Sequence, residues 1–348
     1  MTTSRQTIKY KRLNAAKNEF RILELAPAET TDEQVVCRLV TLPLTDDLEF
    51  LALSSLYGDP KETERILVDG IPITITAHLA QALRHVRTVF FPTLQKPPSS
   101  HSQRRTDRRG PRWLVHLLRH VSSILPNPEA EAETPLRLWI DMLCINQEDE
   151  RETSRQTIRQ IYGSAKMVIG WLGLKNENTN AGLNVLKEID NAMPRCWGDP
   201  GDDELYPENY SPQHRWTRKV EHIWQPNEDG TEAFLAAHWQ GANDFMYRPF
   251  FQRRWILEEM ASGRFPAFLI GDTIVSWKQI LRINRFMEEF KEAKSDVFPQ
   301  RLSAMIAELP LGTIHALLDE FAKRRRQERQ DALTSTQSSS STRGKMSI

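Results

Sequence analysis

Residues Leu136–Gly173, LRLWIDMLCINQEDERETSRQTIRQIYGSAKMVIGWLG, are the stretch that decides the fold. The stretch opens with a short apolar run that stops at Asp141, and a second apolar run begins at Met167. Between the two runs, apolar residues recur at i, i+3, i+4 and i+7, namely Ile158, Ile161, Tyr162 and Ala165. This spacing predicts one buried helical face. Two short buried strands joined by a helix indicate a unit of a parallel sheet.

Acidic residues placed before that helical pattern predict where the helix begins. Four of them follow Asn146, namely Glu148, Asp149, Glu150 and Glu152. Carboxylates in a first turn complement the partial positive charge of a helix N-terminus. The sequence therefore predicts a helix that opens within this acidic group.

The same stretch resembles the central signature of the fungal heterokaryon-incompatibility (HET) domain. That signature runs Leu-Trp-Ile-Asp-x-x-Cys-Ile-Asn-Gln, then Ile-Tyr-x-x-Ala and Trp-Leu-Gly. The chain carries LWIDMLCINQ, IYGSA and WLG in this order. Two further blocks resemble the family, FLALSSLYGD at 50–59 and RPFFQRRWILEE at 248–259.

Three residues depart from the family pattern in those two outer blocks. Ser55 stands where Tyr is usual, and Tyr57 stands where Trp is usual. Glu258 replaces the usual Gln, which removes a hydrogen-bond donor and adds a charge. The departures touch the region where a site is expected, because ligands bind at the carboxyl ends of strands in open α/β sheets.

Patterns outside the central stretch predict the rest of the sheet. Phe20–Leu25 and Val35–Val40 alternate apolar and polar residues and read as two strands. Asp69 and Gly70 suit a two-residue hairpin turn, in which both residues need positive φ. Thr76 is expected to cap the helix that follows.

The fold class that we predict is α/β. HET domains are similar to TIR domains, so the resemblance implies a flavodoxin/TIR-like, mostly parallel sheet with helices on both faces. We expect about five strands in that sheet, an N-terminal β addition and a helical C-terminal extension. The predicted parts are an N-terminal β extension at 1–45, a HET domain at 46–280 with insertions at about 92–135 and 174–245, a C-terminal helical segment at 281–330, and a disordered tail at 331–348.

Composition excludes several classes of function. Lys+Arg and Asp+Glu number 46 each, so global charge favours neither nucleic acid nor an anionic membrane as a partner. The arginines between 104 and 112 have no interleaved aromatic residues and indicate a solvated loop. Cys37, Cys144 and Cys196 lack zinc-ligand spacing, and no metal is expected. No apolar run is long enough to span a membrane and no signal-peptide core is present, so we expect a cytoplasmic location.

No P-loop, dinucleotide-binding, zinc-protease or α/β-hydrolase motif is present. Polar and aromatic residues at the predicted strand ends and in the third block remain as candidates for a site. They are Ser54, Tyr57, Asp141, Asn146, Gln147, Arg253, Trp255 and Glu259.

The resemblance to TIR domains implies a chemistry for Glu259. In TIR enzymes a glutamate four residues after a tryptophan supports hydrolysis of NAD, and Trp255 and Glu259 have that spacing. A carboxylate beside the ribose stabilises an oxocarbenium-like transition state. Glu259 is therefore the candidate catalytic residue, NAD is a possible substrate, and no cofactor is required.

Each candidate also has a purely structural interpretation. Glu259 could be an ion-pair partner of Arg253 or Arg254 on a surface helix, and Tyr57 and Trp255 could be core aromatic residues. The polar residues Asp141, Asn146 and Gln147 could only fix the loop that follows their strand. Cys144 is expected to be a buried apolar residue rather than a nucleophile.

The family resemblance implies a role in fungal self/non-self recognition and programmed cell death. In one interpretation the chain is a signalling module that assembles with itself or with other incompatibility proteins, without turnover. In the second it is an NAD glycohydrolase, and in the third a degenerate, inactive member. No nucleic acid is expected as a partner.

Overall fold

The structure of the protein is a computed structural model. It describes most of the chain, in the ranges 8–90, 136–197, 202–211, 213–223, 237–253, 256–263 and 265–292. The predicted arginine-rich insertion, Trp255, the helical segment beyond 292 and the tail lie outside the described residues. The chain divides into two compact units, one formed by 1–176, 248–250 and 258–278, the other by 177–247, 251–257 and 279–348.

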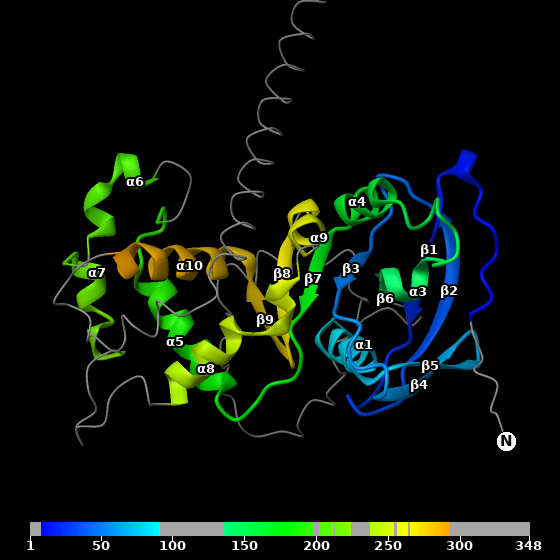
Figure 1. Ribbon diagram of the computed structural model, residues 1–348, viewed down its shortest axis with the longest axis horizontal. Coiled ribbons are helices and arrows are strands. Elements are labelled where there is room, and N and C mark those ends of the chain that lie inside the picture. Colours follow the sequence, from blue (N-terminus) through cyan, green and yellow to red (C-terminus); the bar gives the residue numbers. More distant parts are fainter. Residues whose placement is uncertain are drawn as a thin grey trace, which may run out of the picture. The chain divides into compact units, whose positions relative to one another are not determined.

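All strands of the described residues belong to one sheet in the first unit. They are β1 (Glu19–Leu25), β2 (Val36–Pro43), β3 (Leu51–Ser54), β4 (Thr63–Val68), β5 (Ile71–Thr76), β6 (Leu136–Trp139), β7 (Met167–Trp171), β8 (Pro266–Ile270) and β9 (Thr273–Ser276). Their order across the sheet is β5-β4-β2-β1-β6-β3-β7-β8-β9 (Figure 1). The α/β fold class is confirmed, and the sheet is larger than expected because β1, β2, the β4–β5 hairpin and β9 all join the four central strands.

The helices of the first unit are α1 (Ala77–Phe90), α3 (Asp141–Cys144) and α4 (Arg155–Ser164), with the short helix η1 (Ala15–Lys17). Both α9 (Ile256–Ser262) and η5 (Pro249–Gln252) belong partly to this unit. The second unit contains α5 (Thr179–Ala192), α6 (Asp202–Leu205), η2 (Pro207–Tyr210), α7 (Arg215–Arg218), η3 (Glu221–Ile223), α8 (Ala237–Met246) and most of α10 (Trp277–Glu292). None of the helices described is long and apolar enough to cross a membrane.

Four neighbouring strands, β6, β3, β7 and β8, are mutually parallel and form the centre of the sheet. Every residue of β3, β7 and β8 is buried. Strands buried on both faces are typical of parallel sheets covered on both sides. The carboxyl ends of the four strands therefore meet at one edge.

One face of this parallel block packs against α4 and the end of α9. The register pairs Ala52 of β3 with Trp139 and with Val168, so these three residues share a face. The ring of Tyr162 from α4 meets Trp139 edge-on at 4.9 Å. Gly263, directly after α9, lies so close to Val168 that a Cβ atom there would come within 2.5 Å of it.

The opposite face packs against α1. Successive residues of a strand point to opposite faces, so Trp171 lies on the other side of the sheet from Gly170. His78 and His85 of α1 both pack on the Trp171 ring, with ring centroids 6.2 and 5.2 Å away. The block thus has helices on both faces, as predicted.

Local signals in the sequence agree with the structure at the hairpin and at α1. Asp69 and Gly70 have φ of 52° and 76° and join β4 to β5 as a two-residue turn. The Thr76 hydroxyl accepts a hydrogen bond from the Leu79 N–H at 3.4 Å and caps α1. The same hydroxyl donates to the Tyr57 carbonyl, which ties α1 to the segment after β3.

Candidate functional site

Ser54 is the last residue of β3, in the middle of the parallel block, and its side chain is fully buried. The register pairs Ser54 with Gly170 of β7. Ser54 therefore lies on the face covered by α4 and α9. A hydroxyl buried at this position requires a hydrogen-bond partner, because its desolvation is otherwise costly.

Glu259 of α9 supplies that partner. The Ser54 Oγ donates a hydrogen bond to Glu259 Oε2, across 205 residues of sequence. Glu259 is only half-buried. Its carboxylate therefore joins a buried hydroxyl to the solvent at the carboxyl edge of the sheet, where open α/β sheets bind ligands.

The strand beside Ser54 carries no side chain at Gly170. A Cβ atom on Gly170 would lie 2.7 Å from the ring of Phe250 and 2.9 Å from that of Phe268. These two rings pack edge to face, with centroids 6.0 Å apart. Glycine at this position lets the aromatic pair fill the space next to Ser54.

Three predicted site residues follow β6, and they hold their own loop together. Asp141 opens the four-residue helix α3, and its Oδ1 accepts the Met142 N–H at 2.8 Å. The Asn146 Oδ1 accepts the N–H of Glu148 at 3.2 Å. Gln147 is exposed, and its Nε2 donates to the Asp141 carbonyl at 3.3 Å. These contacts match the structural interpretation of the three residues.

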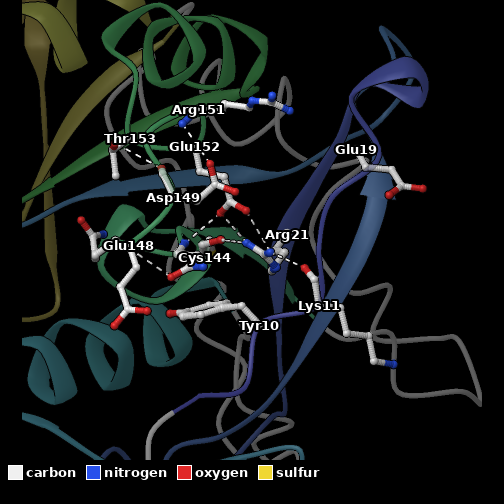
Figure 2. Close-up of polar contacts among 12 residues, drawn as sticks. Tyr10, Lys11, Glu19, Arg21, Cys144, Glu148, Asp149, Arg151, Glu152 and Thr153 are labelled. Carbon is white, nitrogen blue, oxygen red and sulfur yellow. Dashed lines mark hydrogen bonds and ion pairs between the residues drawn. The ribbon is translucent and has the colours of Figure 1, made fainter.

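A buried ion pair fixes this loop to β1, as Figure 2 shows. Arg21 and Glu152 are 2 % and 9 % exposed. Their two hydrogen bonds measure 2.5 Å from Nη1 and 3.0 Å from Nη2. Glu152 Oε2 also accepts the Asn146 N–H at 2.8 Å. A paired charge of this kind is costly to break, because the remaining charge stays buried.

Further groups contact Arg21 on the other sides of its guanidinium group (Figure 2). The Tyr10 ring lies 4.8 Å from the Arg21 guanidinium carbon, and its hydroxyl donates to the Leu143 carbonyl at 3.2 Å. Burial raises the pKa of Tyr10 to about 12. Arg21 also donates to the Lys11 and Cys144 carbonyls, at 2.5 and 3.3 Å.

The prediction that the acidic group opens the next helix is wrong. Residues 146–153 form turns, and α4 begins at Arg155 with Ser154 as its cap. The Ser154 hydroxyl accepts the Thr157 N–H at 3.3 Å. Glu152 points to Arg21 instead, because a buried guanidinium needs a carboxylate more than a helix end does.

Tyr57, another predicted site residue, lies at the surface rather than with the buried Ser54 hydroxyl. Tyr57 is 61 % exposed, so its interpretation as a core aromatic residue is wrong. It follows the end of β3, beyond the buried part of the strand. Arg253 is half-buried and belongs to the second unit. Trp255 lies outside the described residues.

Cysteine chemistry and a metal site find no support within the described residues. Burial raises the pKa of the Cys144 thiol to about 12, so almost no thiolate forms near neutral pH. Cys37 is also buried, and its pKa is raised to about 12 in the same way. Across these residues, no group of three or more His, Cys, Asp or Glu side chains has the arrangement of a metal site.

Arg21 and Glu152 are the residues with clear roles that the sequence reasoning missed. A signal was present, since Arg21 interrupts the apolar strand FRILEL on the face that should be buried. A buried arginine requires a partner. The sequence alone could not name Glu152, which lies 131 residues away.

The family model for heterokaryon incompatibility protein (HET) matches residues 129–259. The resemblance to the HET family is confirmed over this stretch. The match includes the loop fixed by Glu152 and ends at Glu259, while the block at 50–59 lies outside it.

A curated relative extends the similarity. The chain is 26% identical over 291 residues to Heterokaryon incompatibility protein 6, OR allele, of Neurospora crassa. The alignment covers 79% of this chain and 36% of the relative, so the chain spans about a third of the relative's length. No solved structure matches the chain.

Proposed function

We propose that this protein acts in heterokaryon incompatibility, the recognition of self and non-self between fungal cells that leads to programmed cell death. The observation that carries the proposal is the match of residues 129–259 to the HET family. The relative from Neurospora crassa, whose name states this function, supports it. In the first form of the proposal the chain is a cytoplasmic signalling module, and it acts by assembling with itself or with another incompatibility protein.

Expression in a fungal host tests the signalling proposal. Induced expression is expected to reduce the viability of the host, and Glu259→Gln is expected to leave that effect unchanged. Glu29→Gln is a matched control, because Glu29 is an exposed acid in the connection between β1 and β2. Full viability at protein levels that match those of an active HET protein would contradict the proposal and favour an inactive member.

A second candidate function is supported by one observation, the hydrogen bond from buried Ser54 to Glu259. An NAD glycohydrolase of the TIR type needs one carboxylate placed beside the ribose. In this reaction the bond between the ribose C1′ and the nicotinamide nitrogen breaks, and its electron pair stays with nicotinamide. Water adds to C1′ and loses a proton, which gives ADP-ribose.

Glu259 would perform two tasks in that reaction. Its negative charge would stabilise the oxocarbenium-like transition state, and an oxygen could accept a hydrogen bond from a ribose hydroxyl. Nicotinamide is cationic before it leaves, so no strong general acid is needed. Ser54 would be a positioning residue, since its hydroxyl restricts the orientation of the carboxylate.

Loss of NAD in the presence of concentrated, purified protein tests the enzymatic candidate. Glu259→Gln keeps the size of the side chain and removes its charge, and it is expected to abolish turnover. Glu29→Gln should leave the rate unchanged. Turnover that survives Glu259→Gln rejects this site, and an absence of turnover in every variant leaves the signalling module as the better description.

A further inference from the structure

Three ring nitrogens on the α1 side of the parallel block are buried without a hydrogen-bond partner. They are Nε2 of His78, Nδ1 of His85 and Nε1 of Trp171, and none of them has a partner within the part of the chain that the structure describes. Trp171 is fully buried. Buried polar atoms without partners are rare in proteins, and a ligand that supplies acceptor atoms would satisfy this group.

The three rings belong to one cluster. His78 and His85 are seven residues apart on α1, which places them on the same helical face. The His85 ring stacks on Trp171 with 24° between the ring planes, and the His78 ring is tilted at 54°. Trp171 is the last residue of β7, so the cluster lies at the carboxyl edge of the sheet.

A glycine lies beside this cluster. Gly173 has φ of +99°, a conformation that favours glycine, and follows β7 by two residues. A Cβ atom on Gly173 would lie 3.4 Å from Nη1 of Arg248 and 3.9 Å from Cε1 of His78. Gly173 thus lies near both the Arg248 guanidinium group and the His78 ring, and it has no side chain of its own.

The polar side chains of the cluster and the neighbouring Arg248 can all donate hydrogen bonds. The Trp171 indole nitrogen is only a donor, and a neutral imidazole carries one N–H. Burial lowers the pKa of both His78 and His85 below the ordinary value of 6.5, so both imidazoles are neutral at physiological pH. Arg248 adds a fixed positive charge, and its Nη1 donates to the carbonyls of Leu172 and Leu174.

Charged groups around His85 are largely balanced. Asp272 and Asp32 favour its protonated form, while Arg84 and Lys175 oppose it. Lys175 and Asp272 form an ion pair of 2.5 Å. These four groups therefore leave His85 with little net electrostatic bias toward either form.

We propose that His78, His85 and Trp171, beside Arg248, form a binding site for an oxyanion, such as the phosphate group of a nucleotide. The ligand must supply an acceptor, because the Trp171 N–H can only donate. A tetrahedral oxyanion has several acceptor oxygens and a charge that Arg248 stabilises. Binding of an anion also favours protonation of the imidazoles, so the ligand would take up a proton as it binds.

The inference deepens the enzymatic candidate without depending on it. Ser54 and Trp171 lie at the carboxyl ends of neighbouring parallel strands, β3 and β7. A substrate with a diphosphate, such as NAD, would pass around the carboxyl edge of the sheet, with its phosphates at the histidine cluster on the α1 face and its ribose at Glu259 on the opposite face. That identification rests on the proposed glycohydrolase function, whereas the binding of an oxyanion does not.

Titration of the full chain with inorganic phosphate and with ADP tests the site. Protein labelled with ¹⁵N in its tryptophan indoles gives one N–H signal for each tryptophan, and the Trp171→Phe variant identifies the signal of Trp171. Phosphate is expected to shift this signal, because the N–H gains an acceptor. Trp171→Phe keeps an aromatic ring for His85 to stack on and should weaken binding about tenfold.

The histidines supply a second readout. Sulfate, which keeps its charge across the range used, should bind more tightly as the pH falls from about 8 to about 6. His78→Gln should reduce this pH dependence, while Trp171→Phe should retain it. Tighter binding of ADP than of phosphate identifies a nucleotide as the ligand, and equal binding identifies a free anion.

Two results separate this inference from the glycohydrolase proposal. If the Trp171 signal does not move at millimolar phosphate or ADP, the oxyanion site is wrong, even if NAD is cleaved. If phosphate binds and Glu259→Gln binds it equally well while NAD is never cleaved, the oxyanion site stands and the glycohydrolase proposal falls.

Discussion

Two glutamates of the first unit show how differently one residue type is used. Glu152 is 9 % exposed, and its carboxylate accepts hydrogen bonds from Arg21 and from the Asn146 backbone. Glu259 is half-buried and accepts one from the Ser54 hydroxyl. The first acid is enclosed and ion-paired, and the second reaches the solvent. The most recognisable stretch of the sequence thus contains the structural acid, whereas the candidate for chemistry lies elsewhere.

The largest expected effect on stability comes from breaking the buried Arg21–Glu152 ion pair. Glu152→Gln should lower the free energy of unfolding by about 3–5 kcal/mol, because Arg21 would remain buried with its charge uncompensated. Urea denaturation followed by circular dichroism measures the change. A loss below about 1 kcal/mol would show that the pair is solvated in solution and would remove the contrast with Glu259.

A double variant separates the pair from its surroundings. Arg21→Met with Glu152→Leu should be more stable than either single variant, because no charge is left buried alone. The Cys144 thiol provides a local readout, because the backbone carbonyl of Cys144 accepts a hydrogen bond from Arg21. With a pKa of about 12, this thiol should react with alkylating reagents only when the region opens, so Glu152→Gln should speed its labelling.

The next largest effect on stability concerns the packing beside Ser54 and Glu259. Gly170→Ala should cost about 1–3 kcal/mol, because its Cβ atom would overlap the rings of Phe250 and Phe268. Thermal unfolding measures the change. Phe250→Leu should relieve part of the cost in the double variant. If Gly170→Ala is as stable as the original protein, the rings of Phe250 and Phe268 move easily and do not fix the packing next to Ser54.

Local features of the fold could be predicted from the sequence. The hairpin at Asp69 and Gly70 and the cap at Thr76 depend on neighbouring residues only, and both are confirmed. The strands on either side of α4 were also predicted, since their apolar runs are short and well bounded.

Other features depend on partners that are distant in the sequence. Glu152 was assigned to a helix start because such acids usually stabilise one, but the position of Arg21 decides its role. The contact between Ser54 and Glu259 joins residues 205 apart, and it depends on how β3 and α9 come together. The family resemblance suggested both residues, yet only the register of the sheet places the hydroxyl on the face of α9.

A smaller effect on stability is expected for the Ser54 hydroxyl, which would orient Glu259. Ser54→Ala should cost about 1 kcal/mol of stability, the usual net value of one hydrogen bond. Ser54→Ala should lower the rate of NAD cleavage by more than this small loss of stability would explain, since Glu259 would lose an orienting contact. Ser55→Ala is the matched control, because Ser55 is also buried but donates to the adjacent Leu56 carbonyl. Equal effects of both variants on turnover would mean that Ser54 has no special part in the site.

The smallest expected change in stability belongs to Glu259 itself. Glu259→Gln should alter the free energy of unfolding by no more than about 0.5 kcal/mol, because the Gln Oε1 can still accept the Ser54 hydrogen bond. The lost charge lies at the solvent boundary, where its contribution to folding is small. Denaturation of this variant beside Glu152→Gln gives the sharpest form of the comparison. If both variants unfold equally easily, Glu259 is a second structural acid, and any loss of turnover in it reports unfolding rather than chemistry.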